Sequence, residues 1–190
     1  MKLRKVYNYD KNDFILIYVA ELSYRKNQNM IISAVGLLKN KIPNLKVLFV
    51  GDGDYLENYK EIVKKKGVEE IIDFLGYRTD VPDLMKMSDV AISSSRQEGL
   101  PVNVMEAMAT GLPLVVTNCR GNRDLVSNNE NGYVIDLDKI DDFANAIFKL
   151  YTVPDKRQIF GKNSTRLVKK YSLDNVCKEM LKIYSDFLNE

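Results

Sequence analysis

Hydrophobic residues gather in short runs along the chain, separated by stretches with a helical period. The runs are rich in branched and aromatic side chains, which is typical of strands buried on both faces of a parallel sheet. They predict six strands: FILIYVA at 14–20, KVLFVG at 46–51, IIDFLG at 71–76, DVAISS at 89–94, LPLVVT at 112–117 and GYVI at 132–135.

The stretches between these runs carry apolar residues three and four positions apart, which indicates helices with one buried face. Gly67 stands where the second of these helices would stop. Two further stripes follow the sixth strand, and we expect their helices to wrap the sheet. The four stripes are Met30, Ala34, Val35 and Leu38; Tyr55, Tyr59, Ile62 and Val63; Ile140, Phe143, Ala144, Ile147, Phe148 and Tyr151; and Leu173, Val176, Cys177, Met180, Leu181 and Tyr184.

This alternation predicts an α/β fold: a Rossmann-like, doubly wound and mainly parallel six-stranded sheet, with helices on both faces and extra C-terminal helices. Parallel neighbours require right-handed helical crossovers, and 190 residues fit one domain. Neither an internal repeat nor a linker rich in Gly, Pro or Ser interrupts the pattern. In such folds ligands bind beyond the carboxyl ends of the strands.

Composition narrows the chemistry that this fold can carry. A net charge of +2 supplies no strong field for nucleic acid. The absence of histidine removes the commonest general base and metal ligand. Cys119 and Cys177 lack the paired spacing of a zinc or redox motif, so we expect a reduced, intracellular protein. The apolar run at 14–20 is too short and wrongly flanked for a signal peptide, so we expect none, and no segment reaches the about 18 apolar residues that a membrane span needs.

Charged residues and glycines follow the first two predicted strands. Arg25 and Lys26 stand just before a helix start, where a diphosphate would be a natural partner, although a solvated surface pair explains them equally well. Gly51 and Gly53 could let a ligand approach the backbone. They also fit an ordinary tight turn, because Leu56 breaks the G-x-G-x-x-G fingerprint of dinucleotide sites.

The loop after the third strand offers an aromatic residue and a cation. A base or a ribose could stack near Tyr77 and Arg78. Asp80 and Pro82 are explained by a helix start, with Asp80 as the N-cap and Pro82 in the first turn.

The segment after the fourth strand is the most informative part of the sequence. Pro101 suits the first helical position, which places Glu98 in the preceding loop and Glu106 well inside the helix. A phosphate at that helix start would meet unpaired N–H groups and the positive end of the helix dipole. The two carboxylates could then accept from sugar and ribose hydroxyls, whereas a plainer interpretation makes them solubilising charges. We expect the inward stripe of this helix to be Val102, Met105 and Ala109.

A similar turn follows the fifth strand, at residues 118–124. It opens another helix, and Gly121 there is free to adopt a positive φ. The cations of this turn could serve a substrate or salt bridges.

These segments together resemble family 4 of the glycosyltransferases, which are two-domain GT-B enzymes marked by two glutamates separated by seven residues. Glu98, Glu106 and the intervening GLPVNVM match that mark, and the resemblance covers residues 14–190. Enzymes that build capsular, exopolysaccharide or lipopolysaccharide glycans are the most similar. Further matching segments are ELSYRKNQ at 21–28, VGDGD at 50–54, FLGYRTDV at 74–81, EAMATGLPLVVT at 106–117, CRGNRDLV at 119–126 and NGYVID at 131–136.

The resemblance implies a role for each matching residue. Arg25 and Lys26 would hold the donor diphosphate, and Glu98 would engage the transferred sugar as an orienting group and not as a covalent nucleophile. Transfer would retain the anomeric configuration without a metal or another cofactor, mainly by stabilising the leaving diphosphate. Tyr77 and Arg78 would contact the base of the donor, and Glu106 its ribose. Backbone groups from Gly99 to Pro101 would donate hydrogen bonds to it. Gly53, Leu100 and Val102 are the remaining implied contacts with the donor.

The resemblance also implies how the chain is organised. Residues 1–13 would be an extension or the remnant of an interdomain linker, and residues 14–190 the nucleotide-sugar-binding domain. The acceptor domain would be absent, so that the chain is a truncated form, a split gene product or a subunit that transfers sugar only with a partner domain. We expect a UDP-linked donor, a glycan or lipid-linked acceptor, no nucleic acid partner, and a cytoplasmic location, with peripheral association at the inner face of the membrane.

Two other functional classes fit the same residues. One is a non-catalytic module that binds a sugar nucleotide or a protein partner. The other is half of a GT-B sugar-nucleotide epimerase, which would share the fold.

Overall fold

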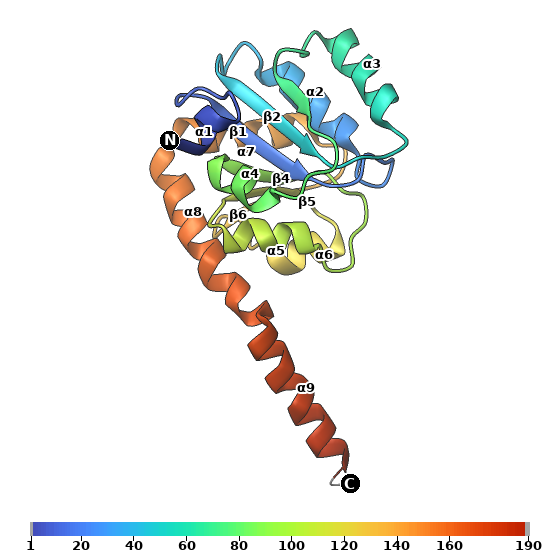
Figure 1. Ribbon diagram of the computed structural model, residues 1–190, viewed down its shortest axis with the longest axis vertical. Coiled ribbons are helices and arrows are strands. Elements are labelled where there is room, and N and C mark those ends of the chain that lie inside the picture. Colours follow the sequence, from blue (N-terminus) through green and yellow to red (C-terminus); the bar gives the residue numbers. More distant parts are fainter. Residues whose placement is uncertain (1, 189–190) are drawn as a thin grey trace.

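Six parallel strands form the centre of the molecule (Figure 1). The structure is a computed structural model that describes residues 2–188 and the side chains of residues 3–186. The sheet order β3-β2-β1-β4-β5-β6 confirms the predicted doubly wound fold. Chain direction across the sheet reverses between β1 and β4, and such a switch point is where these folds bind ligands. The strands are β1 (Phe14–Val19), β2 (Leu45–Val50), β3 (Ile72–Phe74), β4 (Val90–Ser93), β5 (Leu114–Thr117) and β6 (Gly132–Ile135).

Helices cover both faces of the sheet, because successive strand residues point to opposite sides. Leu16 and Tyr18 of β1 belong to one core, whereas Ile15 and Ile17 belong to the other. The first core is closed by α2 (Gln28–Leu38), α3 (Leu56–Lys66), α7 (Ile140–Thr152) and α8 (Pro154–Leu167). The second is closed by α4 (Val81–Met87), α5 (Val102–Ala109) and α6 (Arg120–Leu125).

The helical stripes predicted for α2 and α7 are confirmed, and that of α3 is confirmed except at Tyr55, which is exposed and stands at the cap position before the helix. Met30 and Leu38 of α2, Val63 of α3 and Ile147 of α7 are all buried in the first core. The helix α3 ends at Gly67, whose φ of 60° lies in the left-handed region that favours glycine.

The inward face predicted for α5 was wrong. Val102 and Ala109 are exposed, and the buried face consists of Val104, Ala107 and Met108. The helix begins at Val102, with Pro101 at the cap position. Burial follows the contacts of α5 with α8, the 3₁₀ helix η1 (Val168–Tyr171), α6 and β4, which the period of so short a helix does not determine.

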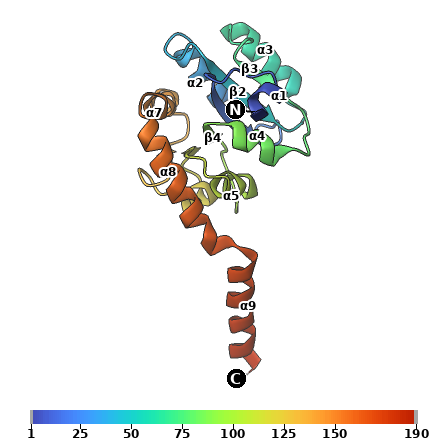
Figure 2. The same cartoon turned by 60° about the vertical axis from the view of Figure 1, so that its left-hand side comes forward.

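The last helix does not wrap the sheet, which corrects a second expectation. After the short 3₁₀ helix η1 (Val168–Tyr171), α9 (Leu173–Leu188) projects away from the domain (Figures 1 and 2). Every side chain from Ser172 to Asp186 is exposed, and Leu173 is 82% exposed. Both faces of the sheet are already covered by α2 and α7 on one side and by α4 and α5 on the other, so the sheet does not need α9 as a cover.

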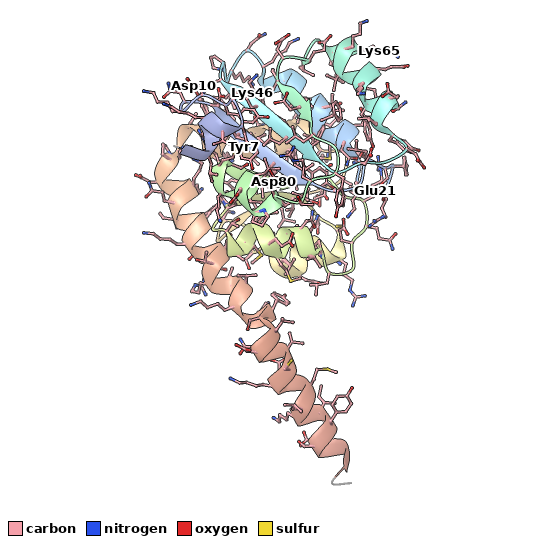
Figure 3. The ribbon with its side chains drawn as sticks, viewed as in Figure 1. Tyr7, Asp10, Glu21, Lys46, Lys65 and Asp80 are labelled. Carbon is pink, nitrogen blue, oxygen red and sulfur yellow. The ribbon has the colours of Figure 1, made fainter. Side chains whose placement is uncertain are left out.

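The N-terminal segment is fastened to the domain through α1 (Lys2–Val6). The Arg4 guanidinium donates to the carbonyl oxygens of Met87 at 2.9 Å and Asp13 at 2.7 Å, and to the carboxylate of Asp89 at 2.8 Å. The hydroxyl of Tyr7 lies next to Asp80 (Figure 3). Within residues 2–188, no helix combines the length and the apolar character that crossing a membrane requires.

Candidate functional site

Two loops meet beyond the carboxyl ends of β1 and β4, at the switch point of the sheet. The ammonium of Lys26 donates to Glu98 Oε1, and Arg25 Nη1 lies 3.4 Å from Glu98 Oε2. The side chains of Glu98 and Lys26 are 7% and 12% exposed, whereas that of Arg25 is 49% exposed. The structure thus brings the three predicted catalytic residues together in one cluster, in which the half-buried guanidinium of Arg25 faces solvent.

Tyr18 and Ser95 support this cluster from inside the sheet. Ser95 Oγ donates to Glu98 Oε1 at 2.6 Å, and the Tyr18 hydroxyl lies 2.8 Å from Ser95 Oγ and donates to the Lys26 carbonyl at 3.0 Å. Burial raises the pKa of the Tyr18 phenol, so the ring stays neutral at this site. Sequence reasoning missed both residues, although a run of serines directly after an apolar strand was a visible signal.

The loop between Glu98 and α5 is open to a ligand. A side chain built at Gly99 would meet nothing within 4 Å. The amide N–H groups of Gly99, Leu100 and Val102 have no acceptor among the described residues. Pro101 has no amide hydrogen, so it cannot be one of the backbone donors that the resemblance implied.

The opposite side of the same loop is held by α6 and by β1. A Cβ at Gly121 would lie 2.4 Å from the Gly99 carbonyl oxygen, and the Gly121 amide donates to the Glu98 carbonyl at 3.3 Å. Gly121 lies within α6 and does not have a positive φ, which corrects the predicted reason for a glycine here. Asn103 Nδ2 donates to the Val19 carbonyl at 2.7 Å and ties the start of α5 to the end of β1.

Glu106 lies apart from this cluster. It stands inside α5 as predicted, but it is exposed and borders a groove between α4 and α5 that is also lined by Val81, Pro82 and Met85. In the part of the chain that the structure describes, its carboxylate makes no hydrogen bond. The two glutamates therefore lie in different environments at the two sides of the start of α5. Glu98 is largely buried beside Lys26 and Arg25, whereas Glu106 is exposed and faces the groove next to α4.

The loop before α4 presents Tyr77 and holds Arg78. The Tyr77 ring is 81% exposed. Arg78 Nε and Nη2 donate to the two carboxylate oxygens of Asp80 at 2.8 and 2.6 Å, and the Tyr7 hydroxyl donates to Asp80 at 2.6 Å. Asp80 occupies the cap position of α4 but makes no side-chain cap, which corrects its predicted role. Hydrogen bonds from the Arg78 guanidinium and, to a smaller extent, from the Tyr7 hydroxyl hold the pKa of the Asp80 carboxyl well below its usual range.

The turn at residues 51–53 packs against the loop after β1. Gly51 and Gly53 have φ values of 138° and 158°, and a Cβ at Gly53 would lie 2.4 Å from the Leu22 carbonyl oxygen. The Leu22 amide also donates to the Asp52 carbonyl at 2.9 Å. Close packing of two chain segments therefore accounts for both glycines. Among residues 2–188, no group of three or more His, Cys, Asp or Glu residues is placed to hold a metal ion.

Comparison with known proteins gives consistent matches to glycosyltransferases. Residues 1–167 match the family model described as glycosyl transferases group 1. EpsD of Bacillus subtilis, which carries a glycosyltransferase name, is 35% identical over 99% of this chain and 49% of its own length. The UDP-Gal:alpha-D-GlcNAc-diphosphoundecaprenol alpha-1,3-galactosyltransferase of Escherichia coli is 30% identical over 97% of this chain and 48% of its own length. The chain thus spans about half the length of these relatives.

Solved structures share the fold. HepE of Anabaena, crystallised in complex with UDP, aligns with a TM-score of 0.91 at 24% identity, over 97% of this chain and 52% of HepE. WaaG, described as a glycosyltransferase involved in lipopolysaccharide biosynthesis, aligns with a TM-score of 0.84 at 20% identity, over 96% of this chain and 50% of WaaG.

Proposed function

The chain belongs to the glycosyl transferases group 1 family, and from that premise we propose that it binds a nucleotide-diphospho-sugar, linked to uridine, for transfer of the sugar. One observation carries this proposal. Arg25, Lys26 and Glu98 converge at the switch point between β1 and β4, where a fold of this kind binds its ligand.

The diphosphate of the donor fits the positive side of this cluster. Two cations against one carboxylate leave a net positive charge at the end of the sheet. The guanidinium of Arg25 is half-exposed, and the ammonium of Lys26 carries three donors, one of which points to Glu98. The free amides of Gly99 and Leu100 add neutral donors beside them. Such preorganised donors would stabilise the charge of the departing nucleoside diphosphate without a metal ion.

The environment of Glu98 suits an orienting role in place of a nucleophilic one. Its oxygens accept from Lys26, Arg25 and Ser95, and its side chain is largely buried. A carboxylate held in this way can accept a hydrogen bond from a sugar hydroxyl. We propose that the acceptor hydroxyl oxygen bonds to the anomeric carbon from the face that the diphosphate leaves, while the bond from that carbon to the diphosphate oxygen breaks and the hydroxyl proton passes to the departing diphosphate. The anomeric configuration is then retained.

The nucleoside would extend from the cluster along α5 toward α4. Tyr77 offers an exposed ring on which a base can stack, and Arg78 is fixed beside it by Asp80. Glu106 faces the groove next to α4 with a carboxylate that could accept from ribose hydroxyls. Gly53, Leu100 and Val102 remain predicted donor contacts.

The acceptor site would lie on a second domain. The chain spans about half the length of its curated relatives, and the Arg25 side chain of the cluster is 49% exposed. The Escherichia coli relative is named for a sugar transfer to a diphosphoundecaprenol-linked acceptor. We propose a glycan or lipid-linked acceptor of surface polysaccharide synthesis, used in the cytoplasm at the inner face of the membrane.

Isothermal titration calorimetry with UDP, GDP and ADP tests the donor site. We expect UDP to bind most tightly. Arg25→Ala and Lys26→Ala should each raise the Kd for UDP about tenfold or more, because each removes a charge-assisted hydrogen bond to a phosphate oxygen. The control variant Lys60→Ala removes a lysine from the exposed face of α3 and should leave the Kd unchanged. Failure of all three nucleotides to bind, or unchanged UDP binding in both variants, would contradict the proposal.

A further inference from the structure

Arg96 is a charged residue beside the donor cluster for which sequence reasoning found no role. It lies two residues before Glu98, at the carboxyl end of β4. Its backbone amide donates to the Arg25 carbonyl at 2.9 Å. The main chain just before Glu98 is thus hydrogen-bonded to the main chain of Arg25, whose guanidinium is the exposed cation of the cluster.

The Arg96 side chain contacts the residues on both sides of the Arg25–Lys26 pair. Its guanidinium carbon lies 4.8 Å from the centre of the Tyr24 ring, which is cation-π geometry. Its Nη2 donates to Asn27 Oδ1 at 3.2 Å, and its Nη1 lies 3.7 Å from an Asp138 carboxylate oxygen. One planar side chain therefore links the loop after β1 to the loop after β6.

The loop at residues 21–27 depends on contacts of this kind. Asn27 has a φ of 55°, a left-handed conformation that is uncommon outside glycine, and its side-chain oxygen is the atom that Arg96 holds. Ser94 Oγ donates to the Asn27 carbonyl at 2.8 Å. Buried Ser23 Oγ and Asn27 Nδ2 have no partner among the described residues, so the loop does not satisfy its own polar groups.

We propose that Arg96 is a positioning residue that fixes Arg25 and Lys26 in the orientation needed for the donor diphosphate. This inference rests on the proposed function. Arg96 itself is 30% exposed and directed at Tyr24, Asn27 and Asp138, so it acts through the two cations. Its removal should weaken the binding of a diphosphate more than the binding of the nucleoside part.

Titration calorimetry of the full chain with UDP and with UMP separates these two contributions. Arg96→Ala should raise the Kd for UDP about tenfold and the Kd for UMP about twofold, which lowers the preference for UDP about fivefold. Arg96→Lys keeps the charge but loses the planar stack and the directed donor to Asn27, so it should show most of the same loss. Arg166→Ala, which removes an arginine paired with Glu130 on the surface, is the matched control and should keep the wild-type ratio.

The outcomes distinguish this inference from the function on which it rests. A wild-type chain that does not bind UDP overturns the proposed function and this inference with it. Wild-type binding with an unchanged UDP-to-UMP ratio in Arg96→Ala overturns the positioning role alone. A wild-type UDP-to-UMP ratio in Arg96→Lys also overturns the positioning role, since a positive charge alone would then be enough to keep the preference for UDP. Thermal unfolding of each variant identifies loss of folding, and Arg96→Lys decides the question if Arg96→Ala is unfolded.

Discussion

At the residue scale, the ion pair of Glu98 with Lys26 has two roles. Both side chains are largely buried, so their charges are screened less by salt than those of surface pairs such as Lys60 with Glu57. The pair holds the loop after β1 against the loop before α5. It also holds the Lys26 ammonium at the end of the sheet and gives this largely buried charge a partner.

Substitution of Glu98 should therefore reduce stability as well as ligand binding. Glu98→Ala leaves the Lys26 charge partly buried without a partner, and we expect the free energy of unfolding to fall by about 3 kcal/mol. Glu98→Gln keeps an acceptor for Ser95 and should cost about half as much. Urea unfolding measures both, with Glu61→Ala on the exposed face of α3 as the control. Equal unfolding midpoints for Glu98→Ala and Glu61→Ala would show that the ion pair has no structural role.

At the element scale, the sequence predicts the strands better than it predicts the contacts between loops. Period and run length determine β1 and the buried face of α2, because each depends on neighbours within the same element. They do not determine why Gly121 is a glycine, since its contact is the carbonyl of Gly99, 22 positions earlier. Tyr18 and Arg96 were missed for the same reason. Their partners come from other loops, and only the folded sheet brings these together.

The helix α9 also shows that the sequence predicts an element better than it predicts what that element contacts. Its amphipathic stripe is real, but a stripe indicates only that an apolar face exists and not where it is buried. We expect removal of residues 173–190 to change the melting temperature by less than about 2 °C, because the side chains from Ser172 to Asp186 are already exposed.

Phe160 of α8 supplies the control for that truncation. Its side chain is buried against Tyr133, and Phe160→Ala should cost about 3 kcal/mol, or about 9 °C. Differential scanning calorimetry compares the two variants. A truncation that destabilises the chain as much as Phe160→Ala would mean that α9 packs on the domain in solution.

At the scale of the whole molecule, strand order decides where the site lies. The chain leaves β1 for α2 on one face of the sheet and leaves β4 for α5 on the other face, which makes the carboxyl ends of these two strands the switch point of the fold. With a net charge of only +2, the molecule as a whole attracts anions weakly. Under the proposed function, we expect selection of a diphosphate to come from the local cluster of Arg25, Lys26 and the free amides beside Glu98.

A crystal structure of the chain with UDP would show whether the diphosphate binds at this cluster. We expect diphosphate oxygens at hydrogen-bond distance, about 3 Å, from Arg25, Lys26 and the amides of Gly99 and Leu100. We also expect the uracil to lie beside Tyr77 and the ribose beside Glu106. A diphosphate bound elsewhere, with the Lys26–Glu98 pair untouched by the ligand, would contradict this expectation.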